Sequence, residues 1–243
     1  MNTQTNIQAK ILAIDTATEA CSAALYIDGV ITEQFKIAPR EHTQLILGMI
    51  ESLLDQSGVK IGELDALAFG RGPGSFTGVR IATGIVQGLA FASDLPVIPI
   101  STLAALAQQA YDNHQQAHVL AAIDARMGEI YWACYAKDEN NLMRLSATER
   151  VSPAESVVLT AGLSKLWCGT GSGWDTYRDQ LKIILDDQLS EIYQDELPHS
   201  SSIVKLAADA FQRGEAIEAS QALPVYLRND VAKKKAEQSK SSA

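Results

Sequence analysis

Residues 65–93 read DALAFGRGPGSFTGVRIATGIVQGLAFAS, which is an apolar run, a glycine-rich stretch and a long segment with helical spacing. The run over 65–69 is typical of a buried strand. Glycine and proline in the middle indicate a turn, and Ser75 or Thr77 is placed to cap a helix that we expect over about 77–93. A strand that feeds a helix through a turn is the basic unit of α/β proteins.

The residues before and after this unit extend the pattern. Residues 10–16 form an apolar run that ends in aspartate and threonine, and Asp28-Gly29 is a two-residue turn between two further segments. Apolar spacing between residues 41 and 57 predicts a helix that Gly58 ends. The first half is thus predicted to contain strands over 10–16, 21–27, 30–37, 65–69 and 96–100, and helices over 41–57, 77–93 and 102–112.

The second half repeats this order. An apolar run over 118–124 again ends in an aspartate, Asp124. After it we expect strands over 128–136, 142–147 and 164–168, and helices near 153–160, 173–185 and 201–213. Three strands, a helix, a strand and a helix, given twice, are the order of a duplicated ribonuclease H-like unit. The predicted fold is therefore α/β and two-lobed, with the actin-like, sugar-kinase-like (ASKHA) architecture.

The predicted lobes meet near the middle of the chain. We expect an N-terminal actin-like lobe over 1–107 and a C-terminal ribonuclease H-like lobe over 108–228, with the late helix near 201–213 able to return to the first lobe. Residues 229–243 are rich in serine and lysine, which is typical of a flexible tail.

The composition is that of a globular protein, with 243 residues of which 47% are hydrophobic and 20% charged. The polar start does not resemble a signal peptide, and no run reaches the roughly 18 to 20 apolar residues that span a bilayer, so we expect a cytoplasmic protein. Cys21, Cys134 and Cys168 lie far apart without a CxxC pair, which predicts buried thiols.

The net charge of −9 limits the partners of the isolated chain. Its lysine cluster, Lys233–Lys235 with Lys240, lies in the tail. A protein that grips nucleic-acid phosphates on its own has a basic face. Strong nucleic-acid binding by this chain alone is therefore not expected.

The stretch from Gly72 to Arg80 allows two interpretations. Its glycines and Pro73 suit a strand-to-helix turn, which is the interpretation that we favour. Backbone N–H groups at a helix N-terminus also attract anions, so a phosphate cradle is the alternative. No Lys-Ser or Lys-Thr pair follows the last glycine, so the stretch is not a Walker loop.

Five segments resemble those of the TsaB (YeaZ) family. GPGSFTGVRI is similar to the family's signature stretch, whose loop here is Gly72, Pro73, Gly74, Ser75, Phe76, Thr77, Gly78 and Arg80. The others are Ile14-Asp-Thr16 (followed by Ala17, where serine is common), Arg40-Glu-His42, Asp124-Ala-Arg-Met-Gly-Glu-Ile-Tyr131 and Pro224-Val-Tyr-Leu-Arg228. Because they follow the family's order, the resemblance covers nearly the whole chain.

The resemblance implies an actin-like scaffold or dimerisation subunit without chemistry of its own. Such subunits pair with TsaD, the enzyme that transfers a threonylcarbamoyl group to N6 of adenosine 37 in ANN-decoding tRNAs, and a small ATPase, TsaE, joins the pair. For this chain it implies a TsaD-like partner, a TsaE-like ATPase through the complex, tRNA only within the complex, no cofactor, and a homodimer as an option when the chain is alone.

No catalytic, cofactor-binding or metal-binding residue is predicted. TsaD-like chains carry a His-x-x-x-His metal pair at positions that resemble Thr102 and Leu106, and neither residue replaces an imidazole ligand. His114 and His118 are four apart, but His118 opens a predicted strand, so the two do not share a helix face.

The alternative from another functional class is an ATP-binding, actin-like kinase or hydrolase. It would place Asp15 and Thr16 near phosphate, and the glycine-rich segment from Gly169 to Gly173 near adenosine. Against it, the loop after Asp15 lacks the glycine that lets backbone approach phosphate, and Glu19 would repel an anion. A strand-to-helix turn also explains these glycines.

Two helices have more apolar surface than one sheet can cover. On the helix over 77–93, two glycines lie on one face, where another backbone can approach. The helix over 42–57 has two adjacent apolar rows. Burial in the chain's own core and contact with a partner explain these patterns equally, and the family resemblance favours contact with TsaD. The predicted interface is Leu45, Met49, Ile50, Leu53, Gly84, Ile85, Gly88 and Leu89.

Overall fold

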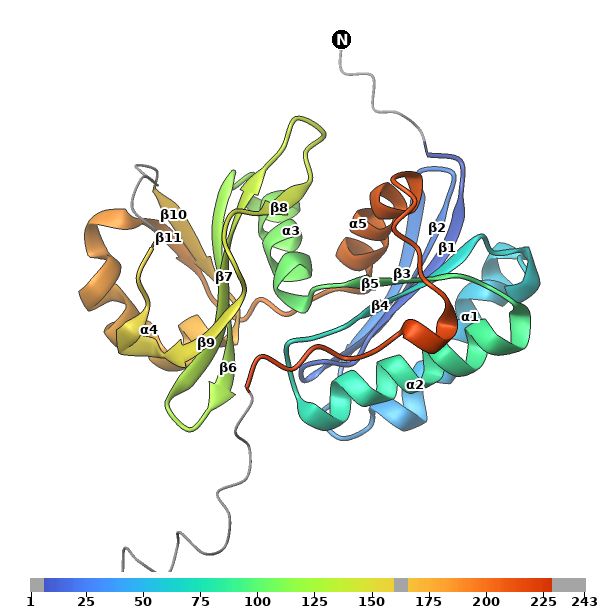
Figure 1. Cartoon of the computed structure of the whole chain (residues 1–243), viewed down its shortest axis with the longest axis horizontal. Helices are drawn as coiled ribbons and strands as arrows, with labels where there is room; N and C mark the ends of the chain where they lie inside the picture. The colour runs from blue at the N-terminus through green and yellow to red at the C-terminus, as the bar shows by residue number, and fades with distance from the viewer. Residues whose placement is uncertain (1–6, 160–165, 229–243) are drawn as a thin grey trace, which may run out of the picture.

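Two mixed β-sheets stand side by side in the computed structural model, which describes residues 7–159 and 166–228 (Figure 1). The first sheet has the order β3-β2-β1-β4-β5, with β1 antiparallel to β2 and parallel to β4. Its strands are β1 (Lys10–Asp15), β2 (Ala20–Ile27), β3 (Val30–Ile37), β4 (Ala66–Gly70) and β5 (Val97–Ile100). The predicted hairpin is confirmed, since Asp28 and Gly29 both take the positive φ that its tight turn requires.

The second sheet repeats the arrangement of the first. Its order is β11-β10-β6-β7-β8, with β9 beside β7. β6 is antiparallel to β7 and parallel to β10, as β1 is to β2 and β4. Its strands are β6 (His118–Arg126), β7 (Glu129–Lys137), β8 (Met143–Leu145), β9 (Arg150–Pro153), β10 (Trp167–Thr170) and β11 (Leu189–Tyr193). The predicted α/β fold of two similar lobes is confirmed.

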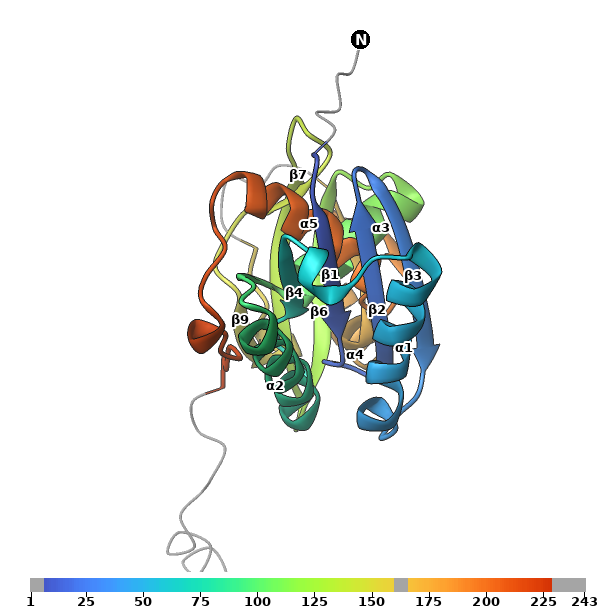
Figure 2. The same ribbon diagram turned by 90° about the vertical axis from the view of Figure 1, so that its right-hand side faces the viewer.

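Helices lie on both faces of each sheet. α1 (His42–Ser57) and α2 (Phe76–Ser93) cover one face of the first sheet (Figure 2), while α5 (Ser200–Gln212) packs on its other face. α3 (Thr102–His114) lies between α5 and the second sheet, and α4 (Ser172–Leu185) covers the far face of that sheet. Short 3-10 turns are η1 (Ile61–Glu63), η2 (Ala154–Ser156), η3 (Asp186–Gln188) and η4 (Ala219–Gln221).

The structure differs from the sequence prediction after residue 145. The helix expected near 153–160 is absent from the described residues; Arg150–Pro153 pairs with β7 as β9, so that only the single turn η2 follows. Residue 160 of that helix, and residues 164 and 165 of the strand expected over 164–168, lie outside the described residues. The described part of that strand is β10, which begins at Trp167. β11 was not predicted because its five residues, LSEIY, are too few to show a period.

Residues near the end of the chain return to the first lobe. α5 places Ile203, Val204 and Ala207 against β1, β2 and β4. After η4 the chain continues over 222–228 between the two lobes (Figure 1). The three cysteines are buried free thiols, as predicted. Within residues 7–159 and 166–228, no helix is long and apolar enough to cross a membrane.

Candidate functional site

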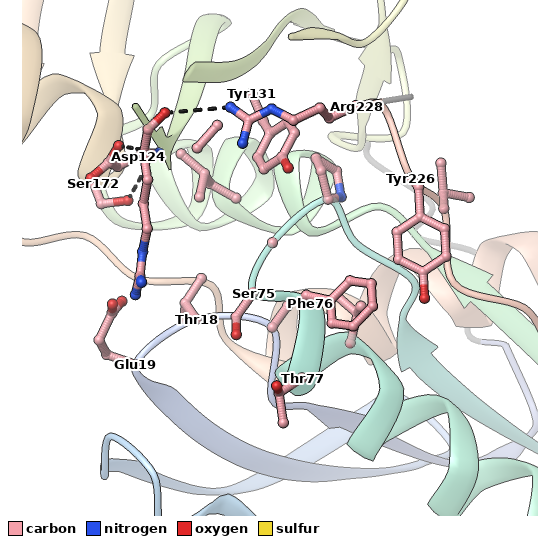
Figure 3. Close-up of a pocket in the computed structure, with 18 of the residues that line it drawn as sticks. Thr18, Glu19, Ser75, Phe76, Thr77, Asp124, Tyr131, Ser172, Tyr226 and Arg228 are labelled. Carbon is pink, nitrogen blue, oxygen red and sulfur yellow. Dashed lines mark hydrogen bonds between the residues drawn. The ribbon is translucent and has the colours of Figure 1, made fainter. Parts of the chain in front are cut away.

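Three segments that stand out in the sequence meet in one cleft between the lobes. They are the loop before α2, the end of β6 and residues 225–228, and the cleft between them has a volume of about 640 Å³ (Figure 3). Its walls are Ala17–Glu19, Pro73–Thr77, Val79, Ile123–Arg126, Tyr131, Ser172, Thr176, Val225, Tyr226 and Arg228. The convergence depends on tertiary structure, so the sequence did not predict it.

The signature loop is pressed against the loop that follows β1. The Ser75 N–H donates to the Ala17 carbonyl oxygen at 2.7 Å, and the Thr16 hydroxyl donates to the Gly78 carbonyl oxygen at 2.7 Å. A side chain at Gly74 or Gly78 would overlap the backbone of the facing loop. The Gly78 N–H points to Ser75 Oγ at 3.4 Å, so that Ser75 caps α2. These contacts explain the glycines as close backbone packing, the turn interpretation that the sequence favours.

The two aspartates that end equivalent strands have different surroundings. Asp15 is only 2% exposed, and burial raises the pKa of its carboxyl to about 7, although the Ala17 and Thr16 N–H groups and His199 oppose that rise. Its Oδ1 accepts from the Ala17 N–H at 2.9 Å, and its Oδ2 has no hydrogen-bond partner among the described residues. Asp124 is half-buried and lines the cleft, where its Oδ1 accepts from the Arg126 N–H at 2.7 Å. Asp15 therefore does not face the cleft.

The glycines that the kinase alternative assigns to adenosine are used for internal packing. A side chain at Gly169 would overlap the indole ring of Trp174, and one at Gly171 would overlap the Ala122 carbonyl oxygen. Trp174 is fully buried, and its ring N–H donates to the Leu120 carbonyl oxygen at 2.9 Å. Neither Gly169 nor Gly171 lines the cleft. These glycines fit helix α4 onto β6, so they offer no surface for a nucleotide base.

Residues 222–228, named the strap below, cross from one lobe to the other. The Gln87 side chain on α2 donates to the Ala222 carbonyl oxygen at 2.7 Å, and the Val225 N–H donates to the Arg71 carbonyl oxygen at 2.8 Å. At the far end, the Arg228 guanidinium pairs with Glu129 beside the β6–β7 turn. The strap therefore ties both lobes together along the cleft.

An exposed group of planar side chains lies where the strap passes the start of α2. The Phe76 and Tyr226 ring centroids are 5.8 Å apart, and the Arg80 guanidinium carbon lies 3.3 Å from the Phe76 centroid and 5.1 Å from that of Tyr226. These three residues are named the aromatic platform below. Phe76 and Arg80 are four apart on one helix and therefore share a face, which is a partial signal in the sequence. No sequence pattern indicated the contribution of Tyr226.

The predicted partner-interface residues separate into three groups by their exposure. Met49, Ile50 and Leu53 are buried against the first sheet, where their side chains pack in the chain's own core and leave little area for a partner. Leu45, Ile85 and Leu89 are half-buried. Gly84 and Gly88 are exposed, and a side chain at either would meet no atom within 4 Å.

The outward face of the two helices carries apolar side chains that the sequence prediction missed. Leu47 on α1 is 53% exposed and Phe91 on α2 is 86% exposed. Gly48, next to Leu47, is also exposed and has open space around it. Leu47 lies outside the two apolar rows that the helical period emphasises, which is why it was missed. The position of an apolar residue outside those rows was the feature of the sequence that could have indicated an exposed apolar surface.

The positions that resemble a metal pair are packed inside the protein. Thr102 and Leu106 on α3 are buried, and Leu106 belongs to the core under the second sheet. His114 at the end of α3 stacks on Tyr193 and pairs with Glu196 at 2.9 Å, while His118 is on β6. Over residues 7–159 and 166–228, no three His, Cys, Asp or Glu side chains form a group that could hold a metal ion.

Comparison with known proteins places the chain in a family. The model of the family described as "TsaD: tRNA N6-adenosine threonylcarbamoyltransferase" matches residues 11–236. The "tRNA threonylcarbamoyladenosine biosynthesis protein TsaB" of Escherichia coli (strain K12) is 47% identical over 230 residues, which are 93% of this chain and 97% of that protein. The chain belongs to the TsaB family.

Further TsaB relatives match nine-tenths of the chain or more. The Haemophilus influenzae protein of the same name is 42% identical over 232 residues, or 93% of this chain and 96% of that one. The solved structure named "YeaZ from Pseudomonas aeruginosa" has a TM-score of 0.85 and 46% identity, and the match covers 90% of this chain and all of that chain. The TsaB resemblance inferred from five segments is thus confirmed.

Proposed function

We propose that this chain is a non-catalytic subunit of the machinery that makes threonylcarbamoyladenosine in tRNA. It pairs with a TsaD-like transferase and, through that pair, with a TsaE-like ATPase, and it supports threonylcarbamoyl transfer to N6 of adenosine 37 in ANN-decoding tRNAs. This activity places it in the cytoplasm with its tRNA substrate. The names of its 47% and 42% identical relatives support the pathway.

One observation carries the scaffold role: the outward face of α2 has no side chains at its centre. Gly84 and Gly88 are exposed with open space in front of them, so a partner helix can approach the backbone there. Exposed Leu47 and Phe91 add apolar area on the outward faces of α1 and α2. Exposed apolar area of this kind is characteristic of protein interaction sites. A second copy of the chain can use the same face when the partner is absent.

The packing of the cleft supports a subunit without chemistry of its own. Asp15 is buried and lines no part of the cleft, and Trp174 occupies the space beside Gly169, so the residues of the kinase alternative do not meet in one site. Thr102 and Leu106 offer no imidazole to a metal ion.

The test is reconstitution from purified components. The chain, a TsaD-like protein and a TsaE-like protein are assayed for threonylcarbamoyl transfer to an ANN-decoding tRNA, with each protein omitted in turn. We expect stable pairing with the TsaD-like protein on a sizing column, and transfer that requires this chain although it has no transfer activity alone. Transfer by the chain alone, or full transfer without it, would contradict the proposal.

A further inference from the structure

The aromatic platform is exposed although its members are apolar or planar side chains. Among the described residues, Phe76, Phe91 and Tyr226 are the aromatic side chains classed as exposed, at 59%, 86% and 43%. Two of these three lie in the platform, in contact with the same arginine. Aromatic side chains that stay open to solvent mark surfaces that bind something.

Arg80 brings a positive charge to the platform that no carboxylate neutralises. Within residues 7–159 and 166–228, no Asp or Glu oxygen lies within 4.0 Å of its guanidinium, which rests instead on the two rings. Arg71 and Arg228, by contrast, pair with Glu149 and Glu129. An unpaired cation beside π faces fits a ligand that is both planar and negatively charged.

We propose that the platform binds an unpaired nucleotide of the tRNA when the chain is assembled with its TsaD-like partner. The base stacks on the exposed faces of Phe76 and Tyr226, and a neighbouring phosphate pairs with Arg80. Proteins bind single-stranded RNA by this combination of stacking and arginine contact. The inference rests on the proposed function, because it takes tRNA as the shared substrate of the complex.

The residues around the platform favour a phosphate near the exposed start of α2. The exposed start of α2 adds the positive end of the helix dipole, with Ser75 and Thr77 as hydroxyl donors. Two acidic side chains, Glu19 and Asp124, also line the cleft, and they lie at the opposite end from Tyr226 (Figure 3). Arg126 lines the cleft beside Asp124, so it is the start of α2 together with Arg80 that draws a negatively charged ligand to the platform.

The platform is continuous with the face proposed to contact the partner. Phe76, Arg80, Gly84 and Gly88 follow one another at intervals of four along α2, so they share one side of the helix. If the partner docks over Gly84 and Gly88, RNA bound to that partner would lie close to the aromatic rings of the platform. Because the partner would hold most of the RNA, the platform adds only one contact. The isolated chain, with its net charge of −9, is therefore not expected to bind RNA tightly.

The test measures tRNA affinity and subunit pairing separately. The complex of this chain with its TsaD-like partner is titrated with fluorescent, unmodified ANN-decoding tRNA, as wild type, as Phe76→Ala/Tyr226→Ala and as Ile183→Ala. The last variant loses an exposed apolar side chain on α4, away from both the platform and the proposed partner face. Pairing is measured by sizing chromatography and fold by the melting temperature. We expect the platform variant to bind tRNA about tenfold more weakly, with pairing and melting temperature unchanged. Phe76→Tyr/Tyr226→Phe, which keeps both rings, should bind as wild type.

Each other outcome counts against the inference. Unchanged tRNA affinity in the platform variant overturns it, as does an equal loss of affinity in Ile183→Ala, which would make the effect unspecific. If the platform variant loses its partner, the rings contact protein and not RNA. If the wild-type chain does not pair with the TsaD-like protein at all, the proposed function fails and the inference with it; unchanged RNA affinity in an intact pair refutes the inference alone. Arg80→Gln, which retains both rings, should weaken tRNA binding and reduce its salt dependence.

Discussion

The Thr16 hydroxyl donates a 2.7 Å hydrogen bond to the carbonyl oxygen of Gly78, across 62 residues of sequence. This bond joins the loop after β1 to the first turn of α2 and holds the signature loop against it. The carboxyl of Asp15, at the end of β1, is buried in the first lobe beside Gly70 of β4. An arrangement that resembles a nucleotide site in sequence is here a packed loop-to-loop contact.

Adding one methyl group at Gly78 should destabilise the protein. In Gly78→Ala the new Cβ overlaps the Thr16 carbonyl oxygen, so a backbone segment must move. We expect the free energy of unfolding to fall by about 1–3 kcal/mol, the usual cost of overpacking. Urea unfolding measures it, with Gly62→Ala as the control, because that glycine is exposed and has no atom within 4 Å of the added group. Equal stabilities in the two variants would show that the loops are not in tight contact.

The buried carboxyl of Asp15 should make stability depend on pH. Its pKa is raised from 3.8 to about 7 in the folded protein, chiefly by burial. Between these values the folded state keeps a proton that the unfolded state has lost, so stability falls as pH rises from about 4 to 7 and stays low above that. At about 1.4 kcal/mol for each pKa unit, the loss amounts to several kcal/mol.

Asp15→Asn, which imitates the protonated acid, should remove this dependence. We expect the variant to unfold at higher urea concentration than wild type at pH 8 and at nearly the same concentration at pH 4. If the difference in stability between the variant and wild type does not grow from pH 4 to pH 8, the pKa of the Asp15 carboxyl is not raised in the folded protein.

The sequence predicted the two lobes better than it predicted which side chains lie on their surfaces. Apolar runs and turn residues mark each strand locally, which is why the β1–β2 and β6–β7 repeats were predicted. The spacing of apolar residues shows that α1 has two apolar rows. This spacing does not tell whether a row is covered by the chain's own sheet or by a partner. Met49 and Leu53 face the sheet, whereas Leu47, outside both rows, faces solvent. The meeting of Phe76 with Tyr226 depends on the path of the strap, which no local pattern encodes.

The isolated chain should bind tRNA weakly and hold no stoichiometric transition metal. Its net charge is −9, and Thr102 and Leu106 stand where TsaD-like chains carry metal-binding histidines. Titration of labelled tRNA near physiological salt should give a Kd no tighter than about micromolar. Metal analysis of protein purified without chelator should find far less than one equivalent of zinc or iron. Submicromolar binding by a variant without residues 232–243 would reveal a basic face on the folded lobes, and one bound metal ion would argue against a non-catalytic subunit.

A large side chain at Gly88 should abolish pairing without harming the fold. Gly88 is exposed on α2, so Gly88→Arg meets no atom of its own chain, and arginine is the better helix former. Against a close-packed partner helix it would hold the two backbones apart. A loss of about 2 kcal/mol, typical of an interface hot spot, weakens binding of the TsaD-like protein by about thirtyfold.

The comparison with two other variants makes the result specific to α2. Gly62→Arg adds the same side chain at another exposed glycine with open space around it, and it should pair as wild type. Met49→Asp places a charge in the first core, so it should melt far below wild type whatever its effect on pairing. Calorimetric titration and melting curves of all three variants separate lost binding from lost fold. Full affinity in a Gly88→Arg variant that melts like wild type would place the partner on another surface, because no close-packed helix could then lie over Gly88.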